Sequence, residues 1–139
     1  MMKKTLLTLA SVVLLTPMLG ASVTASAASW HNGTPKAMRG KYQAKIYQQS
    51  QGFGDEYHIT AHTYIYQASN MPQMKATKLR YKKIKAHTWR LKGHIHQSGM
   101  LRAGKLDMKI YRKGKSFAAV EYGDAFTKLN RAKRVTAFH

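Results

Sequence analysis

Apolar and polar residues alternate along most of the chain from residue 41 onward, and a period of two is typical of half-buried β-strands. Between Thr88 and His96 the apolar positions are two apart and Arg, Lys and His fill the positions between them, which fits a helix poorly. The tail after residue 125 is compatible with one strand, two strands or a short helix. The alternation predicts strands over residues 41–48, 57–67, 74–85, 88–96, 106–111 and 116–122.

Segments rich in Gly, Asn, Pro or Asp separate these strands and predict turns, at residues 49–56, 68–73, 97–99, 113–115 and 123–124. Ile84 breaks the alternation set by Leu79 and Tyr81, so we expect a β-bulge or the approach to a turn there. Within the strand predicted over 57–67, one face would hold Tyr57, Ile59, Ala61, Thr63 and Ile65.

The segment 30–42 leads into the first strand. Asn32-Gly33 is typical of a turn, and Thr34 is a candidate cap for a short helical turn that begins at Pro35. Gly40 would end that turn. Seven or eight strands with short connections indicate an all-β fold, either a sandwich or a barrel. Sequential hairpins favour a small antiparallel up-and-down barrel, because closure removes exposed strand edges.

The first 27 residues have the pattern of a secretory signal peptide. Lys3 and Lys4 precede an apolar run, and Ala25-Ser26-Ala27 is a small-residue cleavage site. The run is shorter than the roughly 18 residues that a membrane-spanning helix needs. We therefore expect export, removal of residues 1–27, a single domain over 28–139 and no transmembrane segment in the mature form. The chain has no cysteine, so that domain folds without disulfides.

The strong positive charge of the chain indicates what kind of partner it binds. The chain has 24 Lys and Arg, of which two lie in the leader, so 22 remain against five acids, a net charge of +17 for residues 28–139. Such an excess steers anionic partners toward a protein. Outside a cell these are teichoic-type wall polymers, acidic polysaccharides, anionic lipid or nucleic acid, the last bound without sequence specificity. The alternative is a soluble surface with no specific partner.

Basic residues interleave with aromatic residues between residues 78 and 92. If the two strands of this region pair, their cations share one sheet face, with Tyr64 and Tyr66 near enough to stack on a sugar or base. The alternative is that Trp89 is simply core and the charges are simply solvated. The candidate residues for binding anionic polymer are Lys78, Arg80, Lys82, Arg90 and Lys92.

Catalytic and metal-binding patterns are weak. No spacing among the five carboxylates indicates an acid and base pair, Ser98-Gly99 lacks a nucleophile elbow, and cysteine catalysis is excluded. His94 and His96 would lie about 6.6 Å apart on one strand face, which suits two ligands of one metal. A third ligand is not evident. We expect neither an enzyme nor a cofactor or metal site.

The opening Gly33-Thr34-Pro35-Lys36-Ala37-Met38-Arg39-Gly40-Lys41-Tyr42 resembles the start of small secreted Gram-positive proteins of unassigned function. More distantly it resembles the lipocalin start, a short helical turn followed by Gly-x-Trp, with Tyr42 in the place of the tryptophan. The lipocalin Thr-Asp-Tyr motif is absent. That resemblance implies an eight-stranded barrel, plugged at one end, that admits a small apolar ligand. It also implies that an arginine from the last part of the chain packs over the ring of Tyr42, and the candidates are Arg131 and Arg134.

Two functions follow. The first is a secreted, non-enzymatic protein whose basic surface associates with anionic cell-surface polymer. The second is a lipocalin-like carrier of a small apolar or amphipathic ligand, although a chain this short allows an interior filled by side chains. The residues expected to line the carrier's cavity are Tyr42, Ile59, Trp89, Leu91 and Met108.

Overall fold

The computed structural model describes residues 29–46, 52–127 and 130–139. The predicted signal peptide lies outside the described residues. Within them, one short 3-10 helix, η1 (Lys36–Met38), accompanies nine strands. No helix among the described residues has the length and apolar character needed to cross a membrane. The strands are β1 (His31–Asn32), β2 (Gly40–Ala44), β3 (Glu56–Ile59), β4 (Tyr64–Gln67), β5 (Met74–Lys85), β6 (Thr88–Ile95), β7 (Gly104–Lys113), β8 (Ser116–Glu121) and β9 (Arg131–Val135).

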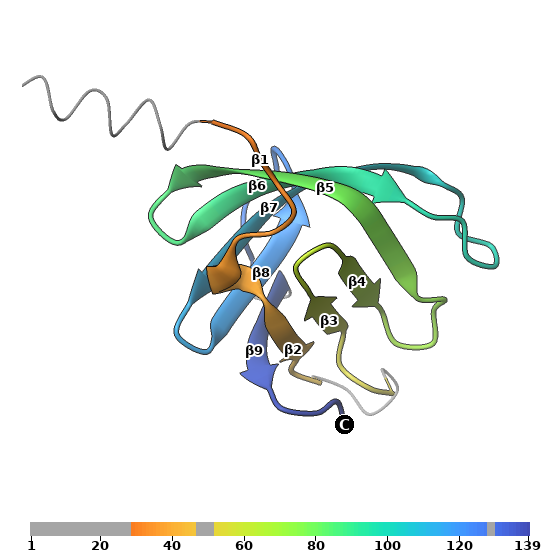
Figure 1. The fold of residues 1–139 in the computed structure, drawn as a ribbon. Coiled ribbons are helices and arrows are strands. Elements are labelled where there is room, and N and C mark those ends of the chain that lie inside the picture. Colours follow the sequence, from red (N-terminus) through yellow and green to blue (C-terminus); the bar gives the residue numbers. More distant parts are fainter. Residues whose placement is uncertain (1–28, 47–51, 128–129) are drawn as a thin grey trace, which may run out of the picture.

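Eight of these strands form a closed antiparallel barrel (Figure 1). Each strand from β2 to β8 pairs with the next one in the chain, and β9 returns to pair with β2. The short β1 adds to the free part of the β5 edge, where His31 lies opposite Tyr81 and Asn32 opposite Arg80. The predicted up-and-down barrel is confirmed, the sandwich is excluded, and the described part of the tail contains a single strand, β9.

The prediction of a single strand over residues 57–67 is wrong, because this segment contains the β3–β4 hairpin. The turn is held by threonine: the Thr60 hydroxyl lies 2.5 Å from that of Thr63, and the Thr60 N–H donates to the Thr63 carbonyl at 3.0 Å. The turn resets the alternation. Tyr57 and Ile59 remain inside, but beyond the turn it is Tyr64, and not Ile65, that is buried in the core.

The opening segment and η1 cover one end of the barrel, which we call the closed end. Thr34 does not cap η1; its hydroxyl instead donates to the carbonyl of Thr60 at 2.6 Å. The Tyr42 hydroxyl donates to the carbonyl of Met38 at 2.7 Å, so η1 is fixed to the barrel wall. The Tyr42 ring stacks on Phe117 with centroids 4.1 Å apart.

The guanidinium over the ring of Tyr42 is that of Arg112, which was not predicted, while the predicted Arg134 also lies close to Tyr42. The guanidinium of Arg112 on β7 lies 5.5 Å from the centroid of that ring and donates to the carbonyl of Ala37 at 2.6 Å. Arg134 is the strand partner of Tyr42 in the β2–β9 register. The contact therefore ties β7 to η1 and reinforces the closed end.

Candidate functional site

Like charges face each other across β5 and β6. The register pairs Arg80 with Lys92 and Lys82 with Arg90. These four side chains lie on the outer face, because the alternating neighbour Leu91 is fully buried in the core. We call them the cationic cluster. Like charges directly opposite on paired strands lower stability, so packing of the sheet does not account for this arrangement.

The indole ring of Trp30 lies over the cationic cluster. Trp30 directly precedes β1, and the pairing of β1 with β5 brings it to this face. Each cation near an exposed aromatic ring contributes about 0.5–1 kcal/mol, which partly offsets the repulsion among the four. The charged groups lie close to the ring centroid, at 5.2 Å for Lys82, 5.3 Å for Lys92, 5.9 Å for Arg90 and 6.0 Å for Arg80.

Arg90 is the member of the cluster that holds a carboxylate. Its Nη2 and Nε donate to the two carboxylate oxygens of Asp107 at 2.7 and 2.9 Å, which lowers the pKa of Asp107. The Tyr122 ring lies 3.6 Å from the same guanidinium and is 45% exposed. Within the described residues, no ion pair joins the other three cations to a carboxylate. Most of the cluster's charge is therefore uncompensated.

Lys78, the fifth predicted polymer-binding residue, does not join the cluster. Lys78 and Leu79 together lie opposite Gly93, so the strand bulges between Thr77 and Arg80, and Lys78 has a φ of 52°. The side chain of Leu79 fills the space over Gly93, where an added Cβ would lie 2.5 Å from Leu79 Cδ2. A second register shift, between Lys83 and Lys85, confirms the irregularity predicted at Ile84.

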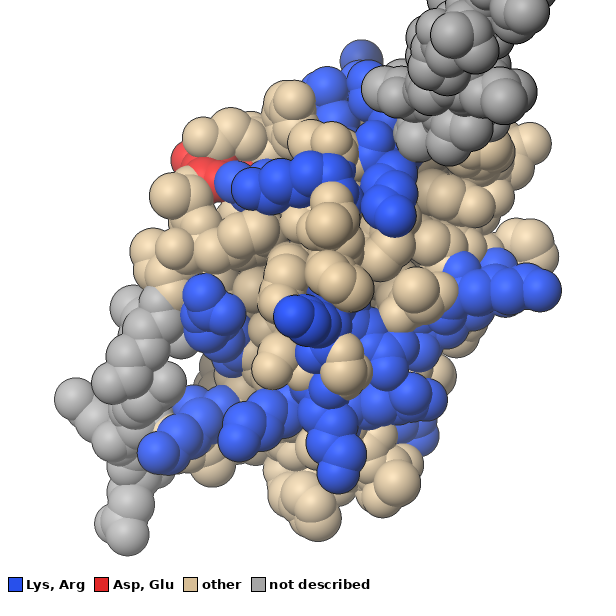
Figure 2. Space-filling model, turned by 90° about the vertical axis from the view of Figure 1, so that its left-hand side faces the viewer, with Lys and Arg blue, Asp and Glu red and all other residues tan. Residues whose placement is uncertain are grey.

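Tyr64 and Tyr66 are not on this face, so the expectation that they would stack beside the cations is wrong. Tyr64 is buried in the core, and Tyr66 donates its hydroxyl to Asp55 Oδ2 at 2.8 Å. Trp30 and Tyr122 are the aromatic residues that accompany the cations. Lysine and arginine side chains also spread over the neighbouring face shown in Figure 2, where a carboxylate is visible at one margin.

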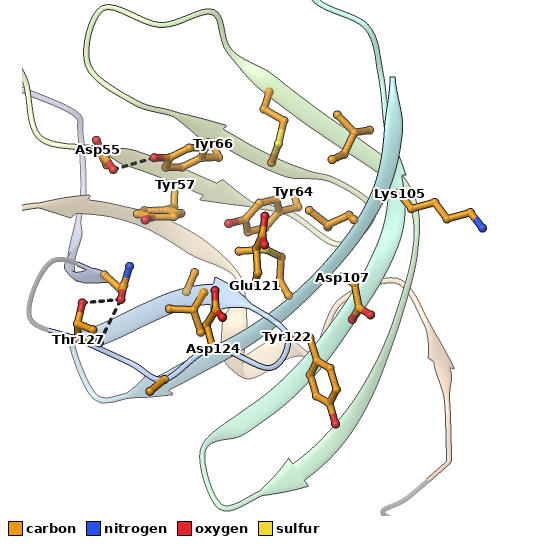
Figure 3. A pocket seen from close by; sticks show the side chains of 18 residues that line it. Asp55, Tyr57, Tyr64, Tyr66, Lys105, Asp107, Glu121, Tyr122, Asp124 and Thr127 are labelled. Atoms are coloured by element: carbon orange, nitrogen blue, oxygen red, sulfur yellow. Dashed lines mark hydrogen bonds between the residues drawn. The ribbon is translucent and has the colours of Figure 1, made fainter. Parts of the chain in front are cut away.

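A cavity of about 990 Å³ opens at the end of the barrel opposite η1 (Figure 3). Its apolar lining includes Met74, Ile95, Leu106 and Met108. Three tyrosines on β3 and β4 form one side, and Glu121 and Asp124 lie on the side formed by β8 and the turn after it. The tyrosines are Tyr57, Tyr64 and Tyr66.

Of the residues predicted to line such a cavity, only Met108 does so. Tyr42, Ile59, Trp89 and Leu91 belong to the packed core near the closed end. All five side chains point inward as the alternation indicated, but four of them lie closer to the closed end of the barrel than the cavity does. The cavity therefore has a different, more polar lining than the one expected.

The tyrosine hydroxyls in the cavity stay protonated at neutral pH. Burial raises the pKa of Tyr66, and its hydrogen bond to Asp55 raises it further. Burial likewise raises the pKa of Tyr57, and the charge of Asp55 adds to that effect. Burial also raises the pKa of Tyr64 well above its ordinary value. These groups serve as neutral hydrogen-bonding side chains.

His94 and His96 share one strand face, with ring centroids 5.3 Å apart, and His96 Nε2 lies 2.5 Å from the Thr77 hydroxyl. Across residues 29–46, 52–127 and 130–139, no three His, Cys, Asp or Glu side chains are placed to hold a metal ion. The candidate sites considered below are the cationic cluster and the cavity.

Comparison of the chain with protein-family models, with curated proteins and with solved structures finds no match.

Proposed function

We propose that this protein binds anionic polymer at a cell surface, of the teichoic type or an acidic polysaccharide, through the cationic cluster. The observation that carries the proposal is the placement of four cations within 6.0 Å of one indole ring, with Asp107 as the carboxylate beside them. A phosphate or carboxylate group among these cations would offset their mutual repulsion. The protein acts as an exported, non-enzymatic binding protein.

Edge protection does not explain these charges. Lysine on an exposed strand edge prevents pairing with other chains. Here β5 pairs with β6 on one edge and with β4 and β1 on the other, while β6 lies between β5 and β7. Locally unfavourable arrangements of this kind are typical of functional sites.

The two aromatic side chains suit a polymer that contains sugar. Trp30 and Tyr122 lie beside the cations, and Tyr122 is 45% exposed. An aromatic ring offers an apolar face with a polar edge, which can contact a sugar ring while the cations hold the adjoining acid groups. Each contact is weak, so binding depends on many of them and weakens as salt rises.

The test compares two variants of equal net charge on immobilised poly(glycerol phosphate), with neutral dextran as the control matrix. In the first variant Arg80, Lys82, Arg90 and Lys92 are all replaced by Gln. In the control variant four exposed lysines elsewhere are replaced by Gln, namely Lys36, Lys75, Lys113 and Lys115.

We expect the unmodified protein and the control variant to be retained at low salt and released as NaCl rises, and the cluster variant to elute early. Equal behaviour of the two variants would show that net charge alone governs retention, and retention indifferent to salt would exclude the proposal. Tighter binding to double-stranded DNA than to the phosphate polymer would assign the cluster to nucleic acid instead.

The second candidate function is a carrier of a small apolar or amphipathic ligand. The cavity of about 990 Å³ favours it, because ligand sites of small molecules are concave spaces of roughly 300–1,000 Å³. Its apolar walls would bury the body of such a ligand, and the polar groups at its opening would fix the orientation.

A further inference from the structure

Carboxylates concentrate around the cavity, although the chain as a whole is strongly basic. Four of the five acidic residues in the sequence line it. One of them, Asp107, is neutralised by Arg90 and lies on the outer side of β7. The other three are Asp55, Glu121 and Asp124, while Lys105, the basic residue of the lining, points away from the cavity in Figure 3.

The cavity also contains polar groups without protein partners. Tyr57 and Tyr64 are 5% and 1% exposed, and neither hydroxyl has a hydrogen-bond partner among the described residues. No completely enclosed side-chain oxygen or nitrogen of that part of the chain lacks a partner, so these two hydroxyls are accessible, and both residues line the cavity. Both hydroxyls are therefore available to a ligand that carries a hydrogen-bonding group.

The walls combine these groups with aromatic faces and an apolar lining. The rings of Tyr57 and Tyr66 lie 5.0 Å apart, and the face of such a ring attracts a cation. Beside them, Leu106 and Met108 offer apolar surface. A ligand that fits all three features has a positively charged head that donates hydrogen bonds and an apolar body.

We infer that the cavity binds a small organic cation with an apolar body, of the primary alkylamine class. Its ammonium group lies between the tyrosine hydroxyls and the carboxylates of Glu121 and Asp124, and its hydrocarbon chain lies against the methionine and leucine side chains. This inference rests on the carrier function, and it sets aside the fatty-acid class, because an anionic head would meet three carboxylates.

The positive charge elsewhere on the molecule does not prevent this binding. Charges separated by more than about 8–10 Å through solvent are largely screened at physiological salt. A ligand head inside the cavity therefore responds to the carboxylates next to it. The cationic cluster lies on the outer face of β5 and β6, and it meets the cavity lining only through Arg90, which contacts Asp107 and Tyr122.

The experiment titrates the protein with octylammonium, 1-octanol and octanoate by calorimetry. These probes share one chain length and differ in the charge of the head. Methyl signals of Met74 and Met108 in NMR spectra locate the binding. We expect octylammonium to bind about tenfold or more tightly than 1-octanol, octanoate to bind weakest, and both methyl signals to shift.

Two variants of equal charge change test the role of the carboxylates. Glu121→Gln removes a charge from the cavity, whereas Glu56→Gln removes the one acid that does not line it. We expect Glu121→Gln to weaken the binding of octylammonium roughly tenfold, equivalent to about 1.4 kcal/mol. The affinity for 1-octanol should stay unchanged. Glu56→Gln should leave all three affinities unchanged.

The possible failures are distinguishable. If 1-octanol or octanoate binds as tightly as octylammonium and shifts the methionine signals, the carrier function stands and the cationic class is wrong. Equal weakening by the two variants would also overturn the cationic class, because it would assign the effect to overall charge. If none of the three probes binds, the carrier function fails as well.

Discussion

Two inward-facing side chains on β7 test the division of the barrel interior into a packed core and a cavity. Ile110 is completely buried within the core, whereas Met108, two residues earlier and on the same face, is partly buried and lines the cavity. Replacing either by Ala removes three heavy atoms from the side chain. The two substitutions are therefore matched in size and strand but differ in surroundings.

The expected losses follow from what each side chain contacts. For Ile110→Ala, three buried carbons at about 0.8 kcal/mol each give roughly 2.4 kcal/mol, and the enclosed space left behind raises the loss in free energy of unfolding to about 3–4 kcal/mol. Met108→Ala enlarges a space that is already open and creates no enclosed one, so we expect about 1 kcal/mol.

Urea unfolding followed by tryptophan fluorescence measures both values, since Trp89 is buried in the core and reports its loss. Losses of equal size would show that Met108 is packed as tightly as Ile110 and that no cavity lies beside it. A loss below 1 kcal/mol for Ile110→Ala would refute the packed core itself.

Three further substitutions test individual contacts. Asp107→Asn should lower stability at pH 7 by about 0.2–1 kcal/mol, the range of exposed ion pairs. Because Arg90 lowers the pKa of Asp107 in the folded protein, that difference should be fully present above the ordinary aspartate pKa of 3.8 and should disappear in urea titrations as the pH falls below it. Gly93→Ala should lower the free energy of unfolding by about 1–3 kcal/mol, because the new Cβ meets Leu79 and a backbone oxygen; an unchanged unfolding midpoint would contradict the described bulge. Tyr42→Phe should lower it by about 1–2 kcal/mol, because a buried carbonyl of η1 loses its donor, and thermal unfolding will show whether it does.

The period-two pattern predicted the barrel because closure and alternation act together. Leu91 on β6 and Ile110 on β7 lie inside as their positions indicated. The pattern failed at residues 60–63, where the turn has no Gly, Pro or Asn. That turn depends on tertiary contacts: the Ala61 carbonyl accepts from the Thr34 backbone, and the Thr60 carbonyl accepts from the Thr34 hydroxyl. A local pattern does not contain such contacts.

The four cations of the cluster were predictable from the sequence, but the exclusion of Lys78 and the presence of Trp30 were not. Alternation and pairing bring four of the five candidate cations together, but the bulge opposite Gly93 removes Lys78. Trp30 was missed because it is about fifty residues away from the cations in sequence. Its signal was present in the strand-forming residues that follow it, His31 and Asn32, which pair with β5.

The cavity was the least predictable feature. Alternation shows which side chains point inward, but it does not show how far along the barrel each one lies. Trp89 and Met108 both point inward, yet one belongs to the core at the closed end and the other to the cavity. The carboxylates there come from the end of β8, the turn after it and the residue before β3, and these segments lie around one cavity only when the barrel closes.

The pairing of β2 with β9 also determines when the protein can finish folding. Gln43 and His139 exchange two hydrogen bonds of 3.0 Å although they are 96 positions apart in the chain. A polypeptide still being synthesised has β2 long before it has β9, so the edges of β2 and β8 with which β9 pairs stay unpaired until β9 has been made. The barrel therefore closes late, and removal of β9 would leave a sheet prone to self-association.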